Sequence, residues 1–437
     1  MSDQSENKEI ALQEHPWLTW TLIAANIFVY LGTQTQADWI KWGAVDPVYV
    51  WSGEIWRMAT AIFFHGGLLH VGLNCFVLLQ IGRLLEPLIG PARFLFVFLV
   101  SGITSFAFSL LINSSNAVGS SGAIFGLVGA LLGIFLILPK NKMERQLLRS
   151  LLWFIAINIT FGFLLNLTVT SFAIDNVAHI GGLFSGFLLG LAFAADKSNR
   201  RFLSAFFLVT GFCLLFVSVS LAVKPFFSAN YYYQMGLHTL GQNKIQEATG
   251  LADILKKMQP GDARAALLQA RIAARNGQDS ISKKYFKQAI ISSTDLSDLW
   301  QLAFRNPDQS SDASGLLFVD VKSSQFLCEA FLQHESSQLL PEMFNECAWL
   351  LLMKDLSNKS YKDQALRWAK KAAALSKNSE PEILHTLAEA YAQNGKIDEA
   401  IMTMERIVLQ KPKNARFFMN EKQRFEKLAK QARAAQF

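Results

Sequence analysis

Long apolar segments dominate the first half of the chain and are absent from the second. Up to Val223, stretches of bilayer-spanning length follow one another with few charged residues between them. There are seven, covering about 17–33, 58–82, 92–112, 120–138, 148–167, 176–195 and 202–223. The pattern therefore predicts a polytopic bundle of seven membrane-spanning helices.

After Pro225 the hydrophobic pattern becomes a helical repeat with a period of about 34 residues. The clearest copy contains Leu384, Leu387, Ala388, Tyr391, Gly395, Ala400, Ile407 and Pro412. Other copies begin near Tyr232, Ala266 and Trp349, whereas 297–345 fits poorly and is expected to be a loop between repeat pairs. The pattern resembles the tetratricopeptide repeat, which implies an all-α domain over 226–437.

Composition agrees with this division. The 437 residues are 51% hydrophobic and 17% charged, while a soluble domain usually has about 25% charged residues. Twenty of the 27 glycines precede Val223, as expected where helices pack closely in lipid. The net charge of +7 forms no basic block, which argues against nucleic acid as a partner. The polar residues 1–16 lack the basic start of a secretory signal and are expected to form an N-terminal tail.

The distribution of Lys and Arg predicts the orientation in the membrane. Ten of these residues lie in the N-terminal tail and the loops on its side of the predicted bundle, and two, Lys41 and Arg57, lie on the other side. The positive-inside rule then places the N-terminus in the cytoplasm and the domain after the seventh span outside it. In a bacterium, the protein would lie in the inner membrane.

Four polar side chains in the predicted spans require an explanation, because polar groups are costly in lipid. His70 and Asn74 are four residues apart and share one helix face, and Ser121 and His179 lie near the starts of the fourth and sixth spans. The predicted topology puts all four in the outer half of the membrane. They are therefore expected to meet at one depth.

These residues belong to motifs that resemble those of the rhomboid family of intramembrane serine proteases. The motifs, in the family's order, are Glu54-x-Trp56-Arg57, His70-x-x-x-Asn74, Gly119-x-Ser121-Gly122 and Ala178-His179-x-x-Gly182. The resemblance covers about residues 16–195. It implies a six-helix protease core over 17–195, with 196–225 forming a loop and an added seventh span.

The resemblance also implies the residue roles. Ser121 would be the nucleophile and His179 its general base, in a dyad that needs no metal, cofactor or ATP. His70, Asn74, Gly119 and the Ser121 backbone N–H would stabilise the oxyanion. The supporting residues would be Phe125, packed on the base, His65, Trp56, Arg57, Gly122 and Gly182. His65 is five residues from His70 and is expected to point to a different face.

Two acidic residues near these motifs have structural interpretations. Asp175 precedes His179 by four residues; a third triad member is conceivable, but Asp at a helix start favours an N-cap. Glu86, at the cytoplasmic end of the second span, is expected to be salt-bridged. Cys328 and Cys347 can form a disulfide only if their domain lies outside the cytosol, and the sequence leaves their pairing open.

The implied function is cleavage of transmembrane protein substrates near the outer membrane face, within the lipid bilayer. An alternative is an inactive rhomboid-like scaffold whose repeat domain binds protein partners, although such relatives lack the serine or the histidine. A transporter would need a polar path through both halves of the membrane. The repeat domain would either recruit a protein or peptide partner or be a passive appendage.

Overall fold

The chain folds as two units, Met1–Tyr231 and Tyr232–Phe437, which are described separately. A computed structural model describes residues 15–36, 38–138, 142–168, 174–304, 326, 328–332, 340–353 and 359–434. Over these residues the regular structure is helical, with an isolated β-bridge between Val45 and Ala117. The structure therefore confirms the all-α fold class.

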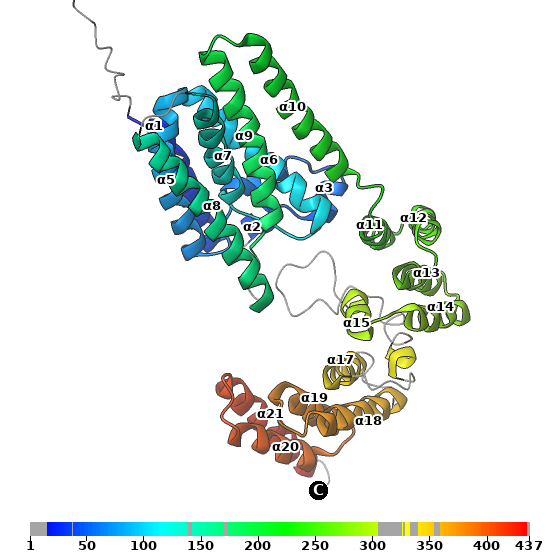
Figure 1. Ribbon diagram of the computed structural model, residues 1–437. Coiled ribbons are helices and arrows are strands. Elements are labelled where there is room, and N and C mark those ends of the chain that lie inside the picture. The colour runs from blue at the N-terminus through cyan, green and yellow to red at the C-terminus, as the bar shows by residue number, and fades with distance from the viewer. Residues whose placement is uncertain are drawn as a thin grey trace, which may run out of the picture. The chain divides into compact units, whose positions relative to one another are not determined.

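The first unit is a helix bundle (Figure 1). Its long helices are α1 (Trp17–Thr35), α5 (Leu68–Ile89), α6 (Pro91–Ile112), α7 (Ser121–Ile137), α8 (Lys142–Thr168), α9 (Asn176–Lys197) and α10 (Arg201–Val223). Between α1 and α5 lie the short helices α2 (Asp38–Gly43), α3 (Pro47–Trp51), α4 (Arg57–Thr60) and the 3₁₀-helix η1 (Ala61–Phe63). Within the described ranges, five helices are long and apolar enough to cross a membrane: α5, α6, α8 over Glu144–Leu165, α9 and α10. The shorter α7 is also apolar, and α1 is not among the five.

The second predicted span begins later than the sequence pattern suggests. The prediction was 58–82, but α5 begins at Leu68, and α4 and η1 occupy the preceding residues. Met58, Ala61 and Ile62 in this region are buried within the protein. Hydropathy alone cannot distinguish burial in protein from exposure to lipid, and the predicted boundary was therefore wrong.

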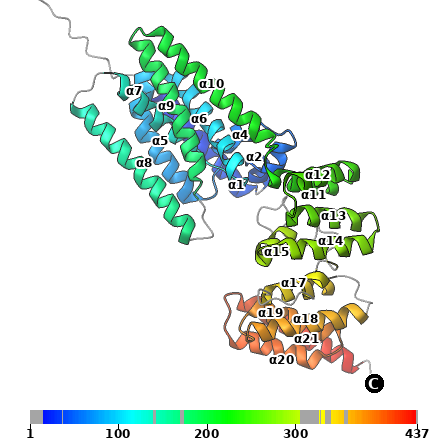
Figure 2. The same ribbon diagram turned by 45° about the vertical axis from the view of Figure 1, so that its right-hand side comes forward.

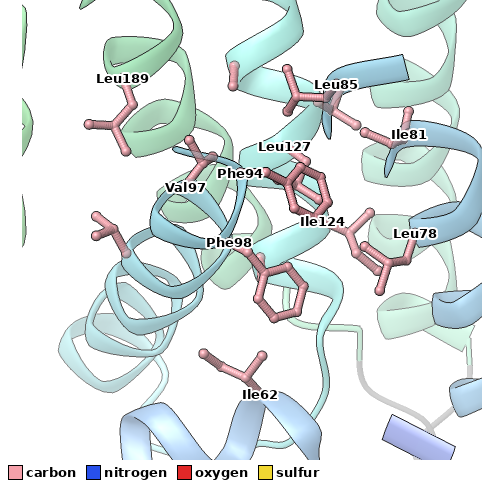
Figure 3. Close-up of a cluster of buried hydrophobic side chains, with 14 of the residues drawn as sticks. Ile62, Leu78, Ile81, Leu85, Phe94, Val97, Phe98, Ile124, Leu127 and Leu189 are labelled. Atoms are coloured by element: carbon pink, nitrogen blue, oxygen red, sulfur yellow. The ribbon is translucent and has the colours of Figure 1, made fainter. Parts of the chain in front are cut away.

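α7 lies inside the bundle, packed against α5, α6 and α9. Figure 3 shows Ile124 and Leu127 of α7 among side chains from α5 and α6, including Leu78, Phe94 and Phe98. The contact between α7 and α9 is close. A Cβ atom on Gly182 would collide with the Gly122 backbone, and one on Gly186 would collide with the Gly126 backbone. Regularly spaced small residues thus let the two helices approach each other closely.

α1 obtains its N-terminal cap from a distant residue. The backbone amides of Leu18 and Thr19 donate to the Glu86 carboxylate at 2.9 and 2.8 Å, and the Thr19 hydroxyl donates to it at 2.6 Å. Glu86 is 3% exposed. Contrary to the expectation, Glu86 forms no salt bridge with any described residue: the carboxylate stabilises the positive end of a helix dipole and satisfies its free amides.

The second unit is a stack of helices that begins with α11 (Figure 2). The helices are α11 (Ala229–Gly241), α12 (Ile245–Met258), α13 (Ala263–Arg275), α14 (Asp279–Ser292), α15 (Leu296–Phe304), α17 (Pro341–Leu352), α18 (Lys359–Leu375), α19 (Pro381–Gln393), α20 (Ile397–Leu409) and α21 (Ala415–Ala434). α13 packs on α14, α17 on α18 and α19 on α20, as the repeat pattern predicts.

The prediction of a loop over 297–345 is wrong at both ends of that stretch. α15 and the start of α17 occupy its ends, and most of the remainder lies outside the described residues. Cys328, within this stretch, forms a disulfide with Cys347 of α17.

Candidate active site

The side chains of Ser121 and His179 are in hydrogen-bonding contact. Ser121 is the first residue of α7 and His179 lies in the first turn of α9. His179 Nε2 is 2.8 Å from Ser121 Oγ. The close glycine packing of α7 on α9 brings the two helix starts together at this distance.

The His179 ring is oriented by an aromatic stack. Phe125, one turn after Ser121, lies parallel to the imidazole, with ring centroids 4.3 Å apart and an interplanar angle of 5°. Phe125 also contacts Phe154 of α8. His179 Nδ1 is buried with no hydrogen-bond partner among the described residues. The ring is thus held by stacking, and no carboxylate of the described part of the chain contacts it.

Asp175 caps α9, as the sequence indicated. Its carboxylate accepts hydrogen bonds from the Ala178 amide at 3.0 Å and from Asn113 Nδ2 at 2.8 Å, and it also accepts from the Ser109 hydroxyl. These bonds tie the start of α9 to the end of α6. Asp175 therefore has a structural role that leaves the imidazole of His179 free.

His70 and Asn74 line the space beside the loop of residues 113–120 that leads to Ser121, called the serine loop below. Both lie on α5, and a Cβ atom placed on Gly119 would be 2.8 Å from the His70 ring and 3.7 Å from Asn74 Nδ2. Asn74 Nδ2 is buried and has no partner in the described part of the chain. A buried, unpaired amide donor is costly unless a ligand uses it, so this group is suited to stabilise a developing oxyanion.

Gly119 contributes space to this site. Its φ of +126° belongs to the region that favours glycine, and a side chain would collide with His70. Its amide donates to the Ala61 carbonyl at 2.9 Å and is therefore already engaged. The Ser121 amide, at the helix start, has no preceding turn to bond with.

His65 contacts His70, contrary to the sequence expectation. The two rings meet edge to face with centroids 5.0 Å apart, because His65 lies before α5 begins and does not follow its helical periodicity. His65 Nδ1 is 3.2 Å from the Phe63 carbonyl, and Nε2 is 3.3 Å from Ser120 Oγ. Since a carbonyl only accepts, Nδ1 carries the proton and Nε2 accepts from Ser120. The spacing of the residues in the sequence did not predict this contact between His65 and Ser120.

Arg57 and Trp56 anchor the segment between α1 and α5. Arg57 Nε is 2.7 Å from Glu54 Oε2, and its Nη1 donates to the carbonyls of Lys41 at 2.7 Å and Ala44 at 3.1 Å. Its guanidinium lies over the Trp56 ring. Within the described residues neither side chain contacts Ser121 or His179; both hold the segment between α1 and α5 in place.

The arrangement brings a hydroxyl, an imidazole and a buried amide donor together in one place. These are the elements of serine acyl-transfer chemistry. Known proteins share this region: a model of the Rhomboid domain matches residues 52–196. YdcA of Bacillus subtilis (strain 168), named as a candidate rhomboid protease, is 30% identical over 196 residues, which are 44% of this chain and 89% of that protein. The chain belongs to the rhomboid family.

Two other rhomboid relatives match more closely over part of their length. Rhomboid protease GluP of Bacillus subtilis (strain 168) is 33% identical over 204 residues, which are 44% of this chain and 39% of GluP. RHOMBOID-like protein 1 of Arabidopsis thaliana is 39% identical over 158 residues, 35% of this chain and 38% of that protein. The chain thus spans about two fifths of these two relatives.

The second unit has its own family match. A tetratricopeptide repeat model matches residues 363–419, from α18 to the start of α21. Together with the apolar helices of the first unit, the matches identify an integral multi-pass membrane protein of the rhomboid family followed by tetratricopeptide-like repeats.

Proposed function

We propose that this protein is an intramembrane serine endopeptidase in which Ser121 is the nucleophile and His179 the general base. The observation that carries the proposal is the 2.8 Å separation between Ser121 Oγ and His179 Nε2 inside an apolar helix bundle. GluP is named as a rhomboid protease and YdcA as a candidate one, which supports the same conclusion.

The geometry supports a two-step acyl transfer. His179 Nε2 takes the proton of Ser121 Oγ as that oxygen attacks the scissile carbonyl, and then returns it to the leaving amine. His179 then takes a proton from a water molecule, which attacks the acyl-enzyme and releases Ser121. Asn74 Nδ2, His70 and the Ser121 amide would donate to the oxyanion that forms in each step.

The substrates we propose are transmembrane proteins cut near the outer membrane face. The excess of Lys and Arg on the N-terminal side supports a cytoplasmic N-terminus, and therefore an outward-facing dyad. The Cys328–Cys347 disulfide supports the same orientation, because disulfides persist in oxidising compartments. In a bacterium this would be the inner membrane, with the repeat unit outside the cytoplasm.

For the repeat unit we propose binding of a protein or peptide partner. Superhelical repeats expose concave surfaces that proteins commonly use for such partners. This role would be independent of the chemistry at Ser121.

The deciding experiment is labelling with a fluorophosphonate probe, which acylates activated serines. Purified wild-type protein should be labelled at Ser121, and Ser121→Ala and His179→Ala should not be. Ser150→Ala, which removes a hydroxyl on the exposed face of α8, is the matched control and should label like the wild type. Equal labelling of the wild type and Ser121→Ala would defeat the assignment. A correctly folded wild type without any labelling would favour the inactive scaffold.

A further inference from the structure

The short helix α3 joins two segments that are far apart in sequence. At its C-terminal end, Trp51 Nε1 donates to the Ala222 carbonyl at 3.0 Å. The Trp51 ring also meets Tyr231 edge to face, with centroids 5.3 Å apart. Ala222 is in the last turn of α10, where carbonyls lack intrahelical partners, so Trp51 satisfies a group that would otherwise be orphaned.

The residues before α3 hold the loop that leads to Ser121. Val45 and Ala117 exchange both backbone hydrogen bonds, each 3.0 Å long. Asp46 follows Val45 and caps α3 by accepting from the Val48 amide at 2.9 Å. Ala117 is four residues before Ser121. The same short segment therefore contacts the end of α10 at one side and the serine loop at the other.

The segment is rigid enough to transmit a displacement. Val45 and Val50 are fully buried, and Trp51 is 6% exposed. The Arg57 guanidinium lies 4.5 Å from the centre of the Tyr49 ring, and Arg57 also binds the carbonyl of Ala44. A five-residue helix spans only about 7 Å, which leaves little length over which to absorb movement.

We propose that Trp51 is a positioning residue that ties the end of α10 to the loop carrying Ser121. Through α3 and the Val45–Ala117 bridge, the segment leading into the repeat unit helps to fix the geometry of Gly119 and Ser121. Trp51 acts through these contacts and not on the reacting atoms. The proposal rests on the proposed function where it links this loop geometry to the rate of serine acylation.

The first test compares Trp51 variants in the full-length protein by fluorophosphonate kinetics. The labelling amplitude reports the fraction of folded protein, whereas the rate constant reports the geometry at Ser121. We expect Trp51→Ala to lower the rate constant about tenfold, since small displacements of reacting groups reduce rates strongly. Trp51→Phe keeps an aromatic ring against Tyr231 but loses the donor, and should lower the rate constant about threefold. Trp17→Ala, at an exposed tryptophan of α1, is the matched control and should not change it.

The second test needs no catalysis. Hydrogen–deuterium exchange should be faster over residues 113–120 in Trp51→Ala, because Val45, whose carbonyl accepts from the Ala117 amide, loses its support. It should be unchanged in Trp17→Ala. A rise in exchange together with a slower rate constant supports the proposal.

The outcomes separate the two hypotheses. A loss of labelling amplitude at an unchanged rate constant, with unchanged exchange over 113–120, would show that Trp51 only packs and would overturn the inference. If the folded wild type is not labelled at all, the proposed function fails. The exchange measurement then decides alone whether Trp51 holds this loop.

Discussion

The backbone amide of His179 donates to the backbone carbonyl of Asp175, 3.1 Å away, while the Asp175 carboxylate caps the helix at Ala178. The two residues are thus joined through the main chain and not through the imidazole. This relationship separates the role of Asp175 from that of the aspartate in a serine-protease triad.

Asp175→Ala should therefore affect stability more than chemistry. Loss of the cap should lower the free energy of unfolding by about 1 kcal/mol, as for other helix caps, and loss of the bonds from Asn113 and Ser109 should lower it further. The rate constant for fluorophosphonate labelling of the folded protein should stay within about threefold of the wild type, whereas loss of a triad aspartate lowers kcat about 10⁴-fold. Thermal unfolding in detergent and labelling kinetics measure the two effects. A rate loss near the triad value would show that Asp175 acts on His179.

Asn74→Ala should reduce turnover without unfolding the bundle. Asn74 Nδ2 is buried and unpaired, so its removal deletes a donor that has no other partner in the described structure. Losing one oxyanion donor lowers kcat about 10²- to 10³-fold. Cleavage kinetics on a transmembrane substrate should show this fall in kcat, with Leu73→Ala, on the exposed surface of α5, as the control. An unchanged kcat in Asn74→Ala would remove Asn74 from the site.

Gly186→Ala should destabilise the first unit strongly. Its new methyl group would collide with the backbone of Gly126, which cannot rotate away as a side chain can. Overpacking of this kind costs about 1–3 kcal/mol or more and would separate α7 from α9. Gly211→Ala is the matched control, because its Cβ would be 3.5 Å from Leu189, an ordinary contact. Thermal unfolding should show a large decrease for Gly186→Ala and little change for Gly211→Ala; similar values would contradict the packing argument.

Glu346→Gln should stabilise the repeat unit at neutral pH. Burial raises the pKa of the Glu346 carboxyl above its ordinary value, although the hydrogen bond from Trp300 Nε1, 2.7 Å long, opposes this shift. The protonated form therefore favours folding, and its contribution is lost as the pH rises through the folded-state pKa. Glutamine keeps an acceptor for Trp300 without a charge.

Unfolding of the full-length protein, followed in the repeat unit, measures this effect. The midpoint temperature of Glu346→Gln should exceed that of the wild type at pH 7, and the difference should disappear below the carboxyl's ordinary pKa. Glu247→Gln, at an exposed carboxylate of α12 in the same unit, serves as the control, because Glu342 repels the Glu346 charge and is therefore not neutral here. A lower midpoint for Glu346→Gln at pH 7 would mean that the ionised carboxylate stabilises the fold.

The sequence was most informative about polar residues in apolar surroundings. His70, Asn74, Ser121 and His179 are conspicuous because lipid-facing helices rarely contain such groups, and the structure brings them to one region. The glycines of α7 and α9 were predictable for a related reason, since regularly spaced small residues mark close helix contacts.

Contacts that depend on tertiary packing could not be predicted. His65 was assigned to the wrong face because the start of α5 at Leu68 is set by the folded loop and not by hydropathy. The Val45–Ala117 bridge and the bond from Trp51 to Ala222 join residues whose types indicate no particular partner. Every residue has a backbone carbonyl, so the sequence does not indicate which carbonyl will accept a hydrogen bond.

The carboxylate that caps α1 has a consequence for the order of assembly. Leu18 and Glu86 are 68 residues apart, so the first helix leaves the ribosome long before its cap has been synthesised. Until α5 follows, the leading amides of α1 must depend on water or lipid headgroups. We therefore expect α1 to remain near the bilayer surface until α5 has been inserted. The two helices then dock late in membrane insertion, when the Glu86 carboxylate reaches the start of α1.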